Sequence, residues 1–156
     1  ARLGGGIPVS PQHGDLAPLI TRVVEEQQRI HPTRAIQVTA SGDTMVRHDA
    51  DRIAQALSNL VGNALQHGNA GTPVCIGVAG SADAVRISIT NDGAVDAKVL
   101  PHLFDPFRAG SQRGAATEGL GLGLYIAQQI VSAHGGEITV DADSARHTSF
   151  LMLLPR

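Results

Sequence analysis

The sequence predicts a two-layer α/β sandwich, in which three helices cover one face of a mixed β-sheet. Three segments show the apolar period of amphipathic helices, and short runs rich in valine and isoleucine lie between and after them. Strands grouped in this way with helices are typical of an α+β arrangement. The chain has 156 residues, of which 42% are apolar and 17% charged, so one domain can bury a sizeable core.

The first helix is predicted to begin at Asp15, whose carboxylate can cap it, and to end near Ile30, before Pro32. Residues 1–14 contain three consecutive glycines and two prolines. We interpret them as a linker with one short edge strand near Ile7–Val9. The chain starts without methionine, so we expect it to continue a longer protein.

The second helix is predicted to begin at Asp49 or Asp51 and to end at His67, before Gly68. Residues 104–119 have no clear period, and a stretch of that length inside a compact domain is usually a functional loop, often a lid. The other predicted elements are strands at 35–40, 44–48, 73–80, 84–92, 137–141 and 148–154, a helical turn near 98–104 and a third helix at 122–133.

Charge and composition exclude several classes of function. A net charge of −2 gives no general attraction to nucleic acid, and no cluster of lysine and arginine provides one locally. Cys75 is the single cysteine, so neither an internal disulfide nor a cysteine zinc site can form. No apolar run approaches the length of a membrane span, and no signal peptide is visible. We therefore expect a cytoplasmic chain, whether or not a longer parent protein is membrane-anchored.

Two asparagines interrupt the apolar second helix. Asn59 and Asn63 lie four residues apart beside its apolar face, and Gln55 and His67 extend the same row. Asparagine is a poor helix former, and burying an amide without a partner costs roughly 1–3 kcal/mol. The pattern indicates that these amides bind something. The alternative is a buried amide network that caps nearby backbone groups.

Three glycines, Gly119, Gly121 and Gly123, stand at the start of the third helix. Each glycine inside a helical turn costs about 1 kcal/mol relative to alanine. Glycines let the backbone approach phosphate oxygens, and a helix N-terminus offers free N–H groups. The spacing is neither that of a P-loop nor that of a dinucleotide fingerprint. The pattern favours an anion cradle, with close packing on a strand as the alternative.

Four motifs in a fixed order resemble the ATP-binding catalytic domain of bacterial sensor histidine kinases. They are the Asn-x-x-x-Asn helix, the turn NDG after a strand, LFDPF and GLGLGL, and the resemblance extends from about Asp15 to Pro155. This superfamily, shared with gyrase, heat-shock chaperones and mismatch-repair ATPases, has the Bergerat fold. RLGGGIP resembles the end of the preceding dimerisation domain. The resemblance implies a linker at 1–14 and a catalytic domain at 15–156.

The resemblance implies that Asn63 coordinates Mg²⁺ through its side-chain oxygen, the kind of ligand that Mg²⁺ prefers. Asn59 stands where hydrolytic relatives place a glutamate that activates water. An amide cannot serve as a general base, which favours a kinase over an ATPase. Gln66 keeps a donor where many relatives have a basic residue. His67 is expected near phosphate or at the helix C-terminus, where the dipole favours a histidine.

The adenine site departs from the family pattern Asp-x-Gly-x-Gly. Asn91 takes the place of the aspartate, and its oxygen can still accept a bond from the adenine amino group. Gly93 is retained, and Val95 is expected to pack beneath the base in place of the second glycine. Thr148, in the stretch HTSF, is expected to line the adenine pocket. One alternative is that Asp92 takes this place in a shifted register, and another is that NDG is a plain turn.

The lid is expected to contact the phosphates. Phe104 and Phe107, in LFDPF, resemble the family's lid anchors. Arg108 and Arg113 either reach phosphate or remain solvated. The residues of the glycine-rich cradle are Gly119, Leu120, Gly121, Leu122, Gly123 and Leu124.

The function implied is that of the kinase module of a two-component sensor. It binds Mg²⁺-ATP and donates the γ-phosphoryl group to a histidine on an upstream helical domain, from which a response regulator receives it. The parent is expected to be a homodimer and this chain a monomer. Two alternatives remain open. One is another enzyme of the superfamily, either an anti-sigma-factor-type serine kinase or an ATPase. The other is a degenerate domain that acts as a scaffold in a sensor.

Overall fold

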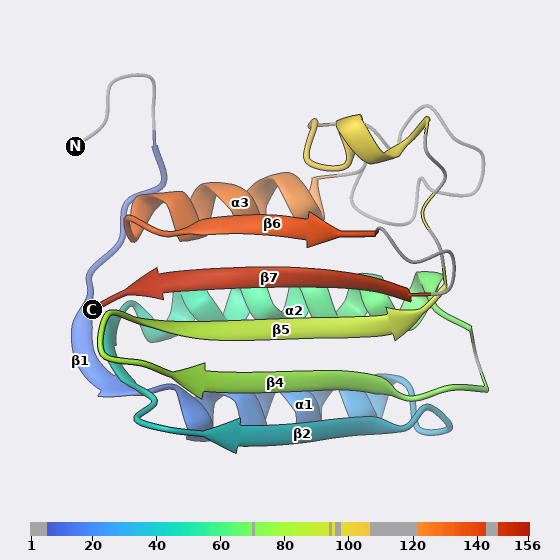
Figure 1. Ribbon diagram of the computed structural model, residues 1–156, viewed down its shortest axis with the longest axis horizontal. Coiled ribbons are helices and arrows are strands. Elements are labelled where there is room, and N and C mark those ends of the chain that lie inside the picture. Colours follow the sequence, from blue (N-terminus) through green and yellow to red (C-terminus); the bar gives the residue numbers. More distant parts are fainter. Residues whose placement is uncertain (1–5, 70, 94, 96–97, 107–121, 143–146) are drawn as a thin grey trace.

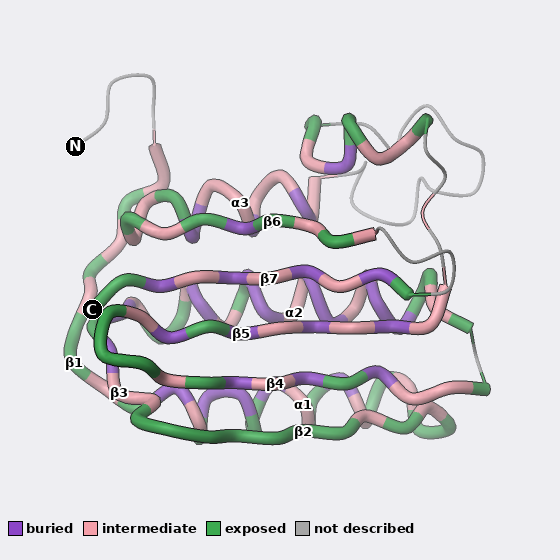
Figure 2. The backbone as a smooth tube through the Cα atoms, in the orientation of Figure 1, coloured by how far each residue is buried: buried purple, intermediate pink, exposed green. Residues whose placement is uncertain are grey.

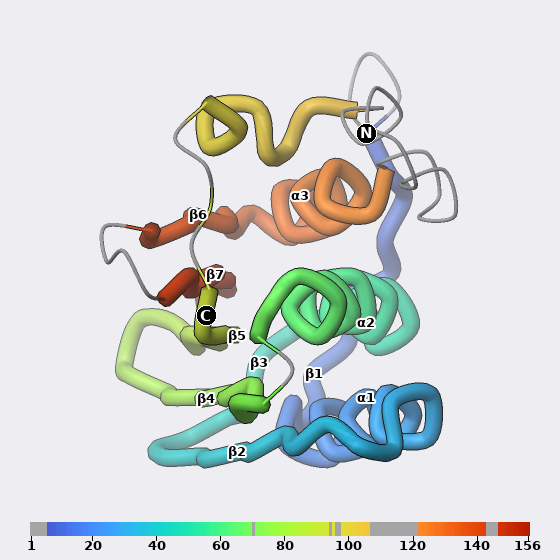
Figure 3. Tube along the Cα trace, turned by 90° about the vertical axis from the view of Figure 1, so that its right-hand side faces the viewer, coloured from blue at the N-terminus to red at the C-terminus, as the bar shows by residue number. Residues whose placement is uncertain are grey.

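The protein is a two-layer sandwich of three helices on one face of a five-stranded sheet (Figure 1). Viewed from the end of the molecule, the helices line one side and the strands the other (Figure 3). This confirms the predicted fold class. The computed structural model describes residues 6–69, 71–93, 95, 98–106, 122–142 and 147–156.

The main sheet is mixed, with the strand order β2-β4-β5-β7-β6. Only β2 and β4 run parallel, and every other neighbouring pair in this sheet is antiparallel. The bounds are β2 Ile36–Ser41, β4 Val74–Gly80, β5 Ala84–Asp92, β6 Glu137–Asp141 and β7 His147–Pro155.

The helices are α1 (Leu16–Ile30), α2 (Ala50–His67) and α3 (Gly123–Ala133), with a 3₁₀ turn at Leu100–His102. Asp15 caps α1, because its carboxylate accepts a hydrogen bond from the backbone N–H of Ala17 at 3.0 Å. Asp49 rather than Asp51 caps α2, by accepting from the N–H of Arg52 at 3.2 Å. The predicted helices are therefore confirmed to within one or two residues.

The core lies between the two layers, where the buried residues of α2 face those of the central strands (Figure 2). Leu57 and Leu60 from α2 and Ile87 and Met152 from the sheet are 0–1% exposed. Phe150 is the one aromatic among the largest fully buried side chains of the described residues. Close packing of aliphatic side chains therefore holds α2 rigidly against the sheet and orients its polar row.

The predicted edge strand near Ile7–Val9 is wrong. The N-terminal strand is β1 (Gln12–Asp15), which pairs antiparallel with β3 (Met45–His48) in a separate two-stranded sheet. Proline has no N–H to donate to a ladder, and Pro8 and Pro11 both precede β1. The strand therefore begins only after Pro11. β2 and β3, although separated by one turn, belong to different sheets.

Candidate functional site

The first asparagine of α2 joins this helix to α3. The Nδ2 of Asn59 donates a hydrogen bond to the backbone carbonyl of Gly123 at 3.0 Å. Gly123 is the first residue of α3, so the bond fixes the start of that helix against the middle of α2. A Cβ added at Gly123 would have the Cγ of Asn59 as its nearest neighbour, at 3.8 Å. The described residues around Gly123 therefore do not themselves require a glycine.

The second asparagine of α2 differs from the first in its hydrogen bonding. Asn63 is half-buried one turn further along α2, on the same side as Asn59. Within the described ranges, no group forms a hydrogen bond with its side-chain amide. Its oxygen is therefore not engaged by the described protein, and the metal-ligand role that the resemblance implies for Asn63 stays a prediction.

The turn after β5 presents a second amide without a partner. Asn91 is 6% exposed, and its side chain has no hydrogen-bonding partner among the described residues. Its Nδ2 lies near two glycines: a Cβ added at Gly68 would stand 3.2 Å from it, and one added at Gly93 3.4 Å. Among the described residues, the fully buried side-chain nitrogen without a partner is the Nε of Arg34, so the amide of Asn91 is not fully enclosed. An amide that lacks a protein partner and is not fully enclosed is available to a ligand.

The neighbours of Asn91 hold this turn in place. Thr148, opposite Asn91 on β7 and 3% exposed, donates its hydroxyl to the carbonyl of Gly93 at 2.7 Å. Gly93 has a φ of +145°, a conformation that favours glycine. The carboxylate of Asp92 accepts from the Nδ2 of Asn69 at 3.3 Å. Asn91 is therefore the more buried residue of the pair Asn91–Asp92, and its place in the adenine site stays a prediction.

The other predicted residues are divided by their burial. Gln66 and His67 are exposed at the C-terminus of α2. Val95 is half-buried and packs against the core, and so does Phe104, whose ring meets Phe150 edge-on with centroids 6.0 Å apart. Leu122 and Leu124 flank the start of α3, where Leu122 is half-buried and Leu124 is 6% exposed within the core.

The side chain of Leu124 is therefore committed to packing, and only its backbone could meet a ligand. Several predicted residues lie outside the described residues: Phe107, Arg108, Arg113, Gly119, Leu120 and Gly121.

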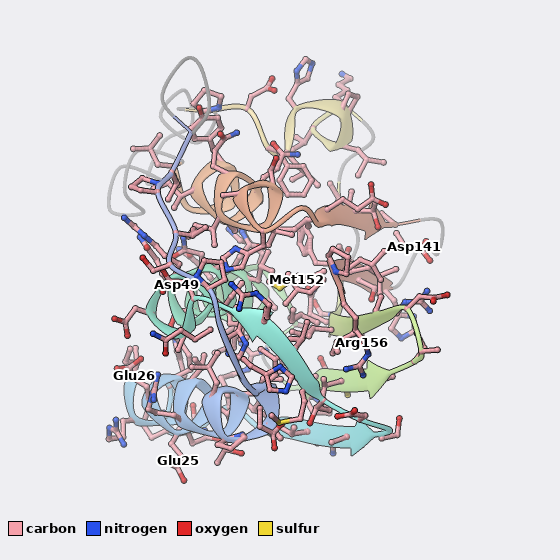
Figure 4. All side chains as sticks on the ribbon, turned by 90° about the vertical axis from the view of Figure 1, so that its left-hand side faces the viewer. Glu25, Glu26, Asp49, Asp141, Met152 and Arg156 are labelled. Carbon is pink, nitrogen blue, oxygen red and sulfur yellow. The ribbon has the colours of Figure 1, made fainter. Side chains whose placement is uncertain are left out.

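The opposite end of α2 carries a polar junction that the sequence did not predict. The carboxylate of Asp49 accepts from the N–H of Ser10 at 2.8 Å, and this bond is the main reason that the pKa of Asp49 lies below its ordinary value. The N–H of Asp49 donates to the Nε2 of His134 at 3.0 Å. Figure 4 shows Asp49 at the start of α2. This junction ties the N-terminal segment and the end of α3 to one helix cap.

Arg34 makes a second set of contacts that no sequence motif indicates. It lies between α1 and β2, and its guanidinium donates to the backbone carbonyls of Leu65, Asn69 and Thr72. Nothing in its local sequence predicts these contacts, because their partners lie 31 or more residues away.

A family model described as "Histidine kinase-, DNA gyrase B-, and HSP90-like ATPase" matches residues 48–156. The chain belongs to this family. The bacteriophytochrome of Pseudomonas aeruginosa is 37% identical over 143 residues, which cover 88% of the chain and 19% of that protein. The sensor histidine kinase TrcS of Mycobacterium tuberculosis is 34% identical over 162 aligned residues, which cover 99% of the chain and 32% of that protein. The chain thus spans less than a third of the length of either relative.

A solved structure agrees with these sequence matches. The catalytic domain of the histidine kinase ThkA has a TM-score of 0.76 and 27% identity to this chain, with 94% of this chain and 98% of that one covered. The predicted resemblance to the ATP-binding catalytic domain of sensor histidine kinases is therefore confirmed. None of the helices that the structure describes is long and apolar enough to cross a membrane.

Proposed function

We propose that this chain is the kinase module of a two-component sensor. It binds Mg²⁺-ATP and presents the γ-phosphoryl group to a histidine on a helical domain that precedes residue 15 in the parent protein. The observation that carries the proposal is the amide of Asn91 beside the C-terminus of α2, which has no partner among the described residues, in a chain of this ATPase family.

The adenine end of the proposed site is built around Asn91. Its side-chain oxygen can accept a hydrogen bond from the amino group of adenine, and its Nδ2 remains available as a donor. Gly68 and Gly93 leave space around the amide, and Thr148 holds the carbonyl of Gly93. An uncharged amide in place of the family's carboxylate gives a weaker hydrogen bond, because charge-assisted bonds are stronger. We therefore expect adenine to be bound, but less tightly than in relatives with the aspartate.

The phosphate end is built around Asn63. Mg²⁺ takes few protein ligands and is usually shared with nucleotide phosphates. In the described residues, no group of three or more His, Cys, Asp or Glu side chains is placed to hold a metal ion. A single amide oxygen from Asn63 fits a metal that the phosphates mostly coordinate. When bound, Mg²⁺-ATP supplies the phosphoryl group. Arg108 and the backbone N–H groups near Gly119–Gly123 would stabilise the phosphate charge, and Gln66 and His67 would contribute hydrogen bonds.

Phosphoryl transfer is favoured over hydrolysis because α2 carries no carboxylate at this site to act as a general base. Asp51 is the only carboxylate within α2, and it lies in the first turn, eight residues before Asn59. At 1.5 Å per residue this separation is about 12 Å along the helix, which is too far for proton transfer to a shared water. The amide of Asn59, bonded to Gly123, has no basicity to offer.

The proposal is tested by calorimetric titration of the chain with a non-hydrolysable ATP analogue, with and without Mg²⁺. We expect binding that Mg²⁺ strengthens. A folded sample that does not bind at millimolar nucleotide would contradict the proposal and favour a scaffold role.

The acceptor is tested separately with the full-length parent and ATP, followed by mass spectrometry of the phosphorylated products. Phosphohistidine supports the proposed acceptor. The proposal also includes a response regulator as the next acceptor and a homodimeric parent. Phosphoserine would instead indicate an anti-sigma-factor-type serine kinase, and free phosphate without a phosphorylated protein would indicate an ATPase.

A further inference from the structure

We infer that Arg34 is a positioning residue for the adenine end of the nucleotide site, an inference that rests on the proposed function. It sets the distance between the last turn of α2 and the turn that carries Asn91. No motif of the sequence includes it.

The first step is the contact of Arg34 with α2. The last four carbonyls of a helix have no partner within the helix. In α2, the carbonyl of Ala64 accepts from the N–H of Gly68 at 2.9 Å, and the carbonyl of Leu65 accepts from the Nη1 of Arg34. A cation at this end also complements the negative end of the helix dipole. Arg34 therefore stabilises the turn that follows Asn63.

The second step is the contact of Arg34 with the loop after α2. Its Nη2 donates to the carbonyl of Asn69 at 3.2 Å and to that of Thr72 at 3.4 Å. Asn69 also contacts the turn after β5 that carries Asn91, called the adenine turn below. Its backbone N–H donates to the carbonyl of Asp92 at 2.8 Å, and its Nδ2 donates to the carboxylate of Asp92 at 3.3 Å. Asp92 is the residue next to Asn91, so the guanidinium of Arg34 links α2, through Asn69, to the adenine turn.

The third step is that Arg34 is itself held rigidly. Gln28, on α1, donates its Nε2 to the backbone carbonyls of His31 at 2.9 Å and Arg34 at 2.6 Å. The Nε of Arg34 is buried and has no hydrogen-bonding partner in the described part of the chain. An unpaired buried donor is unfavourable, so the contacts of the two Nη groups must outweigh it. A planar fork that reaches several carbonyls at once is specific to arginine.

Arg156 provides a matched control at the other end of the sheet. It also donates to three backbone carbonyls, those of Asp43, Met45 and Ser81. Figure 4 looks onto the end of the molecule where Arg156 lies, whereas Figure 3 looks onto the opposite end. A change at Arg156 therefore removes a similar set of contacts without touching the adenine turn.

The test measures the affinity of this chain for a non-hydrolysable ATP analogue with Mg²⁺, together with thermal unfolding, in wild type, Arg34→Met, Arg34→Lys and Arg156→Met. We expect Arg34→Met to weaken binding by about tenfold, the equivalent of one or two net hydrogen bonds. Arg34→Lys should fall between wild type and Arg34→Met, because an ammonium can cap Leu65 but cannot span all three carbonyls. Arg156→Met should lower the unfolding temperature but change the affinity less than about twofold.

A second readout separates positioning from general destabilisation. In nucleotide-free protein, the backbone amide NMR signals of Asn69, Asn91 and Gly93 should shift in Arg34→Met and stay unchanged in Arg156→Met. If Arg34→Met does not fold, the milder Arg34→Lys carries the same comparison.

Three results would overturn the inference. The first is wild-type affinity in a folded Arg34→Met or Arg34→Lys chain, and the second is an equal loss of affinity in Arg156→Met. Both leave the proposed function standing, because wild type binds. The third is a wild-type chain that binds no nucleotide, which rejects the proposed function and this inference together.

Discussion

Asn59 and Asn63 are the same residue type on the same helix, one turn apart, yet the structure uses them differently. The amide of Asn59 is bonded to the carbonyl of Gly123 and joins α2 to α3. The amide of Asn63 has no partner among the described residues. The comparison shows that a repeated polar residue on a buried helix can combine a structural bond with a ligand position. It follows that substitutions at the two sites should separate stability from binding.

The largest effect is expected from Asn63→Ala. Removing even a residue that only orients a metal ligand costs about 10–100-fold in metal affinity, so losing the ligand itself should weaken Mg²⁺-dependent nucleotide binding by about tenfold or more. The unfolding temperature should stay within about 2 °C, because no bond within the described protein is lost. Titration with and without Mg²⁺ checks the prediction. Unchanged Mg²⁺ dependence would remove Asn63 from the metal site.

Asn59→Ala should act mainly on stability. The change leaves the carbonyl of Gly123 without its donor, which should lower the free energy of unfolding by about 1 kcal/mol. Chemical denaturation of both variants is the measurement, with Asn63→Ala as the matched control on the same helix. If Asn63→Ala proved the less stable of the two, our assignment of the roles would be reversed.

Asp49 tests the end of α2 far from the nucleotide. Its pKa is lowered by the N–H of Ser10, so the charged form stabilises the fold fully above the ordinary pKa of 3.8 and progressively less as pH falls through the lowered value. Asp49→Asn removes this component, at a cost of less than about 1 kcal/mol near neutral pH because the group is partly exposed.

The check is urea unfolding of wild type and Asp49→Asn between about pH 7 and pH 2. The stability difference should shrink on acidification, while nucleotide affinity at neutral pH stays the same. A difference that grows toward low pH would show that the sign of the linkage is wrong.

The smallest effect on the fold is expected from Gly123→Ala. A Cβ there would meet Asn59 only at ordinary contact distance, and alanine favours a helix over glycine by up to about 1 kcal/mol, so stability should rise by a few tenths of a kcal/mol. Nucleotide binding should nevertheless weaken, because phosphate would approach the backbone there. Thermal unfolding and titration of the same sample separate the two effects. Unchanged binding would exclude Gly123 from the cradle.

Local patterns were sufficient for most of the fold. The three helices and the six strands from β2 to β7 lie where apolar period and caps predict them, because a cap or a buried stripe depends on residues within one or two turns. The N-terminal strand was misplaced, because its pairing with β3 involves residues 30 to 36 positions away. The order of four motifs was likewise enough to predict the family, which the comparisons confirm.

Local patterns could not predict which polar groups form hydrogen bonds with each other. Asn59 differs from Asn63 because its amide finds a carbonyl 64 residues away, and Arg34 finds its three carbonyls 31 to 38 residues away. Such pairs exist only after packing of the helices on the sheet has brought distant backbone groups within about 3 Å, the reach of a hydrogen bond. Periodicity records which face of an element is buried, whereas the identity of each partner depends on the assembled layers.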